Sequence, residues 1–278
     1  MRLGLGLGID KRRLIASGGG GGFDIDYQAV LDYATLQGYT LASSEQQALQ
    51  NQLLIDLKIA GVWSKLDSFT LFASDGDSDF ALIDWIRLTT ITAINSPTKV
   101  ENQGFYGDAA SAYIDSGIDL SAATNYKQDD ATMCVGHFTC NGGSNNRLIG
   151  SDNSNNFYGA RMDVVNSADS NNRWWFQSGS DASPLYIYNA ASNYIATRRS
   201  NLIYMFSAYR YSDNDNQTFN NNLYSSSALI SANYTILRDR TNYSNNETTV
   251  SHAFIGSQLS NTEIANTHSA FASYYNNL

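Results

Sequence analysis

The chain has 278 residues, of which 15% are charged and 42% hydrophobic, and its formal net charge is −9. This acidic balance argues against nucleic acid as the main partner, because phosphate contacts need a surplus of Lys and Arg. The 18 tyrosines and the many Asn and Ser residues are typical of an all-β protein with polar loops, not of a disordered chain. No stretch approaches the roughly 18 apolar residues of a membrane span, so we expect no membrane partner.

Residues 1 to 22 form a basic, glycine-rich segment on this acidic chain. Arg2, Lys11, Arg12 and Arg13 outnumber the single Asp10, and five consecutive glycines after Ser17 give the segment high conformational freedom. A basic arm favours an acidic neighbour, and we therefore expect it to anchor the protein. Glycines and charges interrupt its apolar residues, so the pattern does not predict a secretory signal.

Residues 23 to 100 show two helical patterns, which predict a small helical-hairpin adaptor region. The first helix should start at Asp26 as N-cap and stop at Gly38. The second should start with a capping box of Ser43 and Gln46, and Gly61 should end it. Pro97 lies in an extended stretch that we expect to form the domain boundary.

The acidic run at residues 75 to 79 has the spacing that opens an EF-hand calcium loop. Position twelve of such a loop needs a bidentate carboxylate, and the residue there is Ile86. We therefore favour a capped polar turn over a calcium site.

Residues 101 to 278 predict a β-sandwich. We expect residues 104 to 120 to form its opening strand and the closing partner to lie near the C-terminus. Short alternating runs, separated by Asn, Asp, Gly and Ser turns, are typical of a sandwich or barrel and exclude a parallel α/β sheet. Ser260 and Glu263 form a capping box that predicts a terminal helix against the sandwich. The further strand candidates are residues 131–139, 147–150, 157–165, 173–177, 185–188, 202–211, 217–223 and 250–255.

Two stretches resemble the LamG-like, concanavalin A-like jelly-roll domains of tailed-phage virion proteins. The closing stretch, residues 253 to 275, reads AFIGSQLSNTEIANTHSAFASYY, and the N-terminal part of the chain also looks similar to such proteins. In the opening stretch, Ala109 and Ala110 replace the usual Gly-Thr pair, which affects only the turn geometry. The opening residues that match are Asn102, Gln103, Gly104, Phe105, Gly107, Asp108, Ser111, Tyr113, Ile114 and Asp115.

The resemblance implies a structural virion protein, such as a fibre, tail or capsid-decorating component, assembled in the bacterial cytoplasm. The basic arm, with Arg2, Lys11, Arg12 and Arg13, would then contact other virion proteins. Similar proteins are often homo-oligomers, although the sequence does not fix their number. The alternative is a glycan-binding adhesin that attaches to a host or to mucus.

The residues do not predict an enzyme. Glycoside hydrolases of this fold place two carboxylates on one strand, and no strand candidate here has that arrangement. His137, His252 and His268 lack the local spacing of a metal site, so we expect half-buried, hydrogen-bonded side chains. Cys134 and Cys140 are six positions apart on one extended run, which favours free thiols.

Two features are candidate ligand sites. Trp174 and Trp175 are adjacent on a predicted strand, so one of them could stack on a sugar while the other fills the core; the alternative places them in the core and in a subunit contact. Asp213 and Asp215 could supply oxygen ligands to Ca²⁺, and the alternative is a solvated hairpin tip. No other cofactor is expected.

Overall fold

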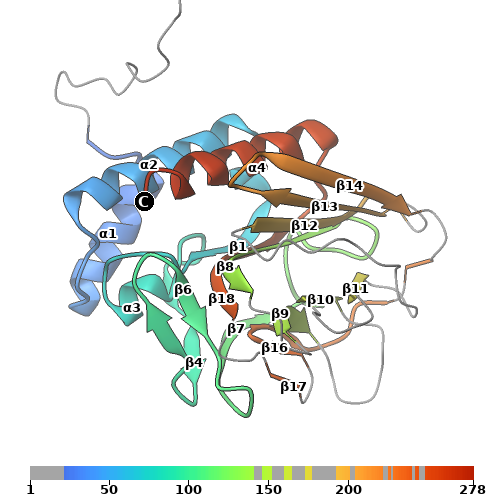
Figure 1. The fold of residues 1–278 in the computed structure, drawn as a ribbon, viewed down its shortest axis with the longest axis horizontal. Coiled ribbons are helices and arrows are strands. Elements are labelled where there is room, and N and C mark those ends of the chain that lie inside the picture. The colour runs from blue at the N-terminus through green and yellow to red at the C-terminus, as the bar shows by residue number, and fades with distance from the viewer. Residues whose placement is uncertain are drawn as a thin grey trace, which may run out of the picture.

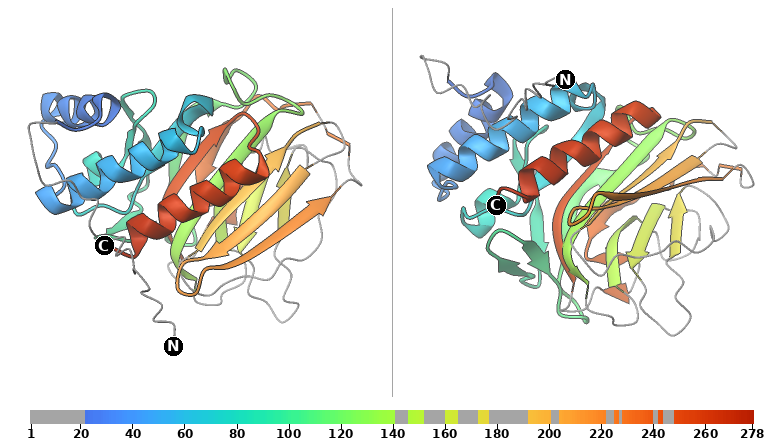
Figure 2. Two further views of the ribbon diagram at one scale, coloured as in Figure 1. Left: turned by 90° about the horizontal axis from the view of Figure 1, so that it is seen from above. Right: turned by 45° about the horizontal axis from the view of Figure 1, so that its top comes forward.

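The computed structural model folds into two antiparallel β-sheets with helices on the outer face of one of them (Figures 1 and 2). This confirms the predicted mainly-β sandwich with N-terminal helices and a C-terminal helix. None of the helices in the described part of the chain is long and apolar enough to cross a bilayer. The structure describes residues 22–140, 146–151, 160–164, 173–176, 192–200, 204–221, 225–226, 228–239, 242–243 and 248–278.

The larger sheet, sheet A, has ten strands among the described residues, in the order β14-β13-β12-β8-β18-β1-β2-β3, with β6 on β18 and β5 on β6. All of its pairings are antiparallel, as predicted. Its strands are β1 (Leu66–Leu71), β2 (Ile83–Asp84), β3 (Thr89–Thr90), β5 (Thr98–Val100), β6 (Gly104–Tyr106), β8 (Ala131–Cys140), β12 (Ser192–Arg198), β13 (Tyr204–Arg210), β14 (Asp215–Asn221) and β18 (Thr248–Gly256).

The smaller sheet, sheet B, faces sheet A across the core. Its described strands follow the order β11-β10-β9-β15-β7-β4, and a separate ribbon joins β16 to β17. The strands of sheet B are β4 (Thr92–Ile94), β7 (Tyr113–Asp119), β9 (Asn146–Ser151), β10 (Ala160–Val164), β11 (Arg173–Phe176) and β15 (Asn233–Ile236), and those of the ribbon are β16 (Arg238–Asp239) and β17 (Asn242–Tyr243).

The helices begin and end at side-chain caps that the sequence largely predicts. Helix α1 (Ile25–Gln37) takes Asp24 as its N-cap, so the prediction of Asp26 is wrong; the Asp24 carboxylate instead accepts the Asp26 N–H at 3.0 Å. Gly38 closes α1 with a φ of +77°, the left-handed conformation that glycine adopts freely. The other helical segments are α2 (Ser44–Ile59), a 3₁₀ turn (Trp63–Lys65), α3 (Ser78–Ala81) and α4 (Asn261–Tyr275).

Helix α2 shows half of its predicted capping box, and α4 shows the whole of its own. The Ser43 hydroxyl accepts the Gln46 N–H at 3.3 Å, but the Gln46 side chain turns to Asn102. Ser260 and Glu263 make both capping contacts. In the acidic run before α3, Asp77 accepts the Phe80 N–H at 2.8 Å, which is the contact of a capped turn.

Alternate residues of sheet A face two separate hydrophobic layers. Met133 and Val135 of β8 pack between the two sheets, whereas Cys134 packs under the helices. Helices α2 and α4 lie side by side over this second layer (Figure 2). Phe271 of α4 is fully buried there, beside Phe254 of β18. Both faces of sheet A are therefore buried, as two apolar layers require.

The predicted opening stretch divides between the two sheets. Phe105 of β6 pairs with Val250 of β18, so the expected partner near the C-terminus is confirmed for this short strand. Strand β7 lies instead in sheet B, between β15 and β4. The turn between β6 and β7 is held by Asp108, whose carboxylate accepts the N–H groups of residues 110 to 112 at 2.7 to 2.9 Å. These bonds hold the pKa of Asp108 well below its usual range.

Sheet pairing crosses the domain boundary expected near residue 100. Strand β1, from the segment predicted as an adaptor, pairs with β18 from Leu66 to Leu71. Strands β4 and β5 also join sheets B and A from residues before 101. The first hundred residues thus supply strands to both sheets.

Candidate functional site

A β-bulge in β1 turns one carboxylate out of sheet A. The pairing of β1 with β18 shifts between Leu66 and Ser68, and Asp67 is the extra residue. Its carboxylate accepts backbone N–H groups of Thr124, Asn125 and Tyr126 at 2.7 to 3.0 Å. Asp67 therefore fixes the loop after β7 against the edge of β1.

A second carboxylate, Asp84 at the end of β2, holds an arginine between the two sheets. Asp84 is fully buried and accepts Nε of Arg87 at 2.8 Å, while Nη2 of Arg87 donates to the Ser116 carbonyl of β7 at 2.5 Å. Asp84 also accepts the Ser68 hydroxyl at 2.6 Å, and that hydroxyl lies 2.5 Å from the Tyr234 hydroxyl. Burial, and then the nearby Asp84 carboxylate, raise the pKa of Tyr234. The guanidinium is thus locked in one position.

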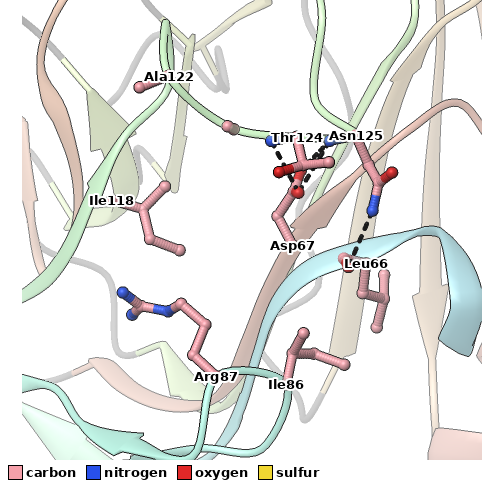
Figure 3. Close-up of a pocket in the computed structure, with 9 residues that line it drawn as sticks. Leu66, Asp67, Ile86, Arg87, Ile118, Ala122, Thr124 and Asn125 are labelled. Carbon is pink, nitrogen blue, oxygen red and sulfur yellow. Dashed lines mark hydrogen bonds between the residues drawn. The ribbon is translucent and has the colours of Figure 1, made fainter.

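These two arrangements enclose a cavity of about 420 Å³. Figure 3 shows Arg87 and Ile118 on one side of the cavity and Thr124 and Asn125 on the opposite side. Apolar side chains provide most of its wall, and polar groups from three different segments converge on it. The lining residues are Leu66, Asp67, Ile86, Arg87, Ile118, Ala122, Ala123, Thr124 and Asn125.

Three polar atoms of the lining have no hydrogen-bond partner among the described residues. They are Nη1 of Arg87, Oδ1 of Asn125 and the Thr124 hydroxyl, since Asn125 uses only its Nδ2, on the Leu66 carbonyl, and Arg87 uses Nε and Nη2. Gly117 leaves room at Nη1, because a Cβ at that position would lie 4.0 Å from it. A fixed donor, an acceptor and a hydroxyl on apolar walls suit a polyol with an apolar face.

The two predicted tryptophans lie on the edge strand of sheet B. Trp174 and Trp175 of β11 pair with Met162 and Arg161 of β10. Their side chains lie outside the described residues, so their role in binding sugars stays a prediction. Neither residue lines the cavity at Arg87.

The predicted calcium ligands are engaged with an arginine. Nη2 of Arg210 lies 2.6 Å from Asp213 and 3.4 Å from Asp215, at the turn between β13 and β14. The hydrogen bond from Arg210 is the main reason that the pKa of Asp213 is lowered. These contacts match the hairpin tip that was the alternative. In the described part of the chain, no group of three or more His, Cys, Asp or Glu side chains could hold a metal ion.

The three histidines are fully buried rather than half-buried as predicted. His252 bonds Tyr275 at 2.6 Å and Asn193 at 3.1 Å, and Asn193 also contacts His268 at 3.2 Å. Cys134 lies in the same network as a free thiol, and burial raises its pKa well above the usual value. Helix α4 covers this network, so its nucleophile is closed to substrate and carries no evident chemistry.

The strand candidate at residues 185–188 lies outside the described residues. Two predictions of site or thiol side chains lie there as well. The first is the basic arm, with Arg2, Lys11, Arg12 and Arg13. The second is the side chain of Cys140, whose strand is described and whose thiol is not. Both stay predictions.

No protein-family model and no curated protein matches the chain. Among solved structures, a mutant of Trypanosoma rangeli sialidase displaying trans-sialidase activity is 11% identical, with a TM-score of 0.51. The match covers 88% of this chain and 39% of the sialidase, so this chain spans about two fifths of that protein's length. The similarity supports the fold.

Two smaller domains also match. The CBM40 domain of Ruminococcus gnavus IT-sialidase, bound to α2,3-sialyllactose, is 12% identical over 60% of this chain and 96% of its own, with a TM-score of 0.40. Domain 4 of the arabinanase AbnA from Geobacillus stearothermophilus, in complex with arabinotriose, is 10% identical over 73% of this chain and 98% of its own, with a TM-score of 0.45.

The residues of the cavity were missed by sequence reasoning. Asp67 and Thr124 are 57 residues apart, and Arg87 and Ser116 are 29 apart, so only sheet pairing brings them together. One local signal was present: Asp84 and Arg87, at a spacing of three, form an ion pair within a short segment. That signal indicates the pair but not the cavity in front of it.

Proposed function

We propose that this chain is a carbohydrate-binding β-sandwich protein and that its sugar site is the cavity at Arg87. The observation that carries the proposal is the convergence of three polar atoms, on Arg87, Thr124 and Asn125, that have no partner among the described residues and lie around apolar walls that include Ile118. A volume of about 420 Å³ accommodates one or two sugar rings. The site is built on hydrogen-bonded elements, so its groups are oriented before a ligand arrives.

The contacts of the two carboxylates favour binding without hydrolysis. Glycosidases need one carboxyl group as an acid and a second as a base or nucleophile. Asp67 is occupied by three backbone N–H groups, and Asp84 is buried behind Arg87. Both carboxylates are thus engaged by groups of the protein itself.

A glycan array on the full chain tests the proposal. We expect the unmodified protein to bind a defined set of glycans and Ala122→Trp to lose that binding. Ala122 is an exposed lining residue, so an indole at this position fills the cavity without entering the core.

Ala265→Trp is the matched control, since Ala265 is an exposed residue of α4 away from the cavity. This variant should keep the binding pattern. Trp174→Ala and Trp175→Ala test the alternative site on β11 and should also keep it. If Trp174→Ala or Trp175→Ala lost binding while Ala122→Trp kept it, the sugar site would lie on β11 instead.

A structural role in a tailed-phage virion is the second candidate function. The specific observation is that both halves of the resembling signature lie in sheet A. Phe105 of the opening stretch pairs with Val250 of β18, the strand that also contains residues 253 to 256 of the closing stretch. We expect a protein lacking residues 1 to 22 to fold but not to join the particle. Normal incorporation of this truncated protein would contradict the anchoring role of the arm.

A further inference from the structure

The charges around the cavity restrict the class of sugar that it accepts. Of the residues that line it, only Asp67 and Arg87 carry a formal charge. Directly behind Arg87, and fully buried, lies the carboxylate of Asp84, 2.8 Å from Nε. The three groups together have a net charge of about −1 at neutral pH.

Arg87 acts in the cavity mainly as an oriented hydrogen-bond donor, because a neighbouring carboxylate compensates its charge. Asp84 compensates the guanidinium, and Nη2 is used by the Ser116 carbonyl, so Nη1 remains as a fixed hydrogen-bond donor. A donor in this state suits a sugar hydroxyl. A free carboxylate would usually be bound by an arginine through two parallel hydrogen bonds, whereas Nη1 is the one nitrogen of the Arg87 fork that is not already engaged by another described residue.

Asp67 places a negative charge on the opposite part of the wall. Its oxygens accept the N–H groups of residues 124 to 126, which fixes the carboxylate in its place. Lys127 is the nearest cation of this loop, and its Nζ donates to the Ala123 carbonyl at 2.5 Å. On β7, Asp119 follows the inward-facing Ile118, and Asp115 lies on the same outer face as Asp119, so this strand beside the cavity is also acidic. The chain as a whole is also acidic, with a formal net charge of −9.

We infer that the cavity binds neutral sugars and discriminates against sugars that carry a carboxylate. The inference rests on the proposed carbohydrate-binding function and names its ligand class. Hydroxyl groups of a neutral sugar meet Nη1 of Arg87, Oδ1 of Asn125 and the Thr124 hydroxyl. The apolar face of the ring packs on Ile86 and Ile118. An acidic sugar has the same hydroxyls but meets like charge in a site whose described lining holds no cationic side chain besides Arg87.

Matched sugar pairs test this inference on the full chain. The pairs are lactose with α2,3-sialyllactose, galactobiose with digalacturonic acid, and cellobiose with cellobiuronic acid, measured by isothermal titration calorimetry. In the pair that binds, we expect the neutral sugar to have a dissociation constant about tenfold or more below that of the acidic sugar, which corresponds to about 1.4 kcal/mol. Its affinity should stay nearly constant between about 0.01 M and about 0.1 M salt, since no net charge is paired on binding.

Ala122→Trp and Ala265→Trp accompany each titration, so that binding is assigned to the cavity. Thr124→Val, which removes one hydroxyl and keeps the shape of the side chain, should lower the affinity for the neutral sugar severalfold. Equal or tighter cavity binding by the acidic member overturns the inference and leaves the proposed function standing. Failure of all six sugars to bind, or binding that Ala122→Trp leaves intact, overturns the cavity site and the inference together.

Discussion

At the scale of single residues, close contacts decide which side chains the sheets tolerate. Gly136 of β8 faces His252 of β18, and a Cβ on Gly136 would lie 2.0 Å from Cε1 of that ring. The ring has no room to move, because Tyr275 and Asn193 bond its two nitrogens. Position 136 therefore needs glycine for space, not for backbone conformation.

We expect Gly136→Ala to lower the free energy of unfolding by about 1 to 3 kcal/mol, the usual cost of overpacking. Urea denaturation followed by circular dichroism measures this change. Gly22→Ala is the matched control, because nothing lies within 4 Å of a Cβ at that position. A Gly136→Ala protein as stable as the parent would show that the histidine can be displaced at no cost.

The sequence predicts those residues whose partners are local. Ser43, Ser260 and Gly38 were recognisable as caps because each acts within one turn of its own helix. Ala109 adopts a φ of +63° where the resembling domains have glycine, so the turn keeps its left-handed residue without one. Asp67 gives no comparable signal, since its role depends on a bulge that only the pairing of β1 with β18 creates.

At the scale of elements, helix α4 covers two buried histidines that bond no carboxylate among the described residues. His268 packs against Tyr209 and bonds Ser207 and Asn193, while His252 stacks on Phe271. Burial lowers the pKa of His268 to about 3, and burial together with the neighbouring histidines lowers the pKa of His252 well below its usual value. Both side chains are thus neutral in the folded protein across the mildly acidic range.

These pKa values predict a loss of stability on acidification. Below a pH of about 6.5 the unfolded chain binds protons that the folded chain does not. The free energy of unfolding therefore decreases as the pH is lowered. Each histidine contributes up to about 1.4 kcal/mol per pH unit, and the loss continues toward the folded pKa. Urea denaturation between a pH of about 6.5 and about 5 measures the slope.

His268→Gln should remove one histidine's share of that slope, whatever its effect on stability at neutral pH. Ser260→Ala serves as the control: it removes the cap of the same helix and should shift stability without changing the slope in this range. An unchanged slope in His268→Gln would mean that this side chain titrates normally in the folded state.

The longest strands of sheet A were predictable from the sequence. β8 and β18 were found, with errors of one or two residues at their ends. β12 was missed: like the longer β18 it is buried along its whole length, but it has only seven residues, which lie between the core on one side and the helices on the other. A short strand buried on both faces has no period of two to detect.

At the scale of the whole molecule, β1 ties the N-terminal third to the sandwich. It lies between β18 and β2 in sheet A, and its Phe69 is fully buried under the helices beside Phe254 and Phe271. Local patterns predict helices and strands in residues 23 to 100 but not their insertion into a sheet completed at residue 256. The boundary was predicted from local composition, whereas the pairing of β1 with β18 joins residues that are almost 200 positions apart.

We therefore expect residues 101 to 278 alone not to fold as a monomer. Without β1 and α2, β18 presents an unpaired edge and Phe254 loses part of its cover, which favours aggregation. Size-exclusion chromatography and thermal unfolding test this, with residues 23 to 278 as the control that keeps every described strand. A monodisperse, cooperatively unfolding fragment 101 to 278 would instead establish the sandwich as an independent domain.

The central claim, a sugar site at Arg87, is tested most directly by a crystal structure of the full chain soaked with a neutral glycan selected on the array. The account predicts electron density for a sugar between Ile86, Ile118 and Thr124, with a hydroxyl within hydrogen-bond distance of Nη1 of Arg87. Density for the same glycan on β11 at Trp174 and Trp175, with the cavity at Arg87 empty, would contradict it.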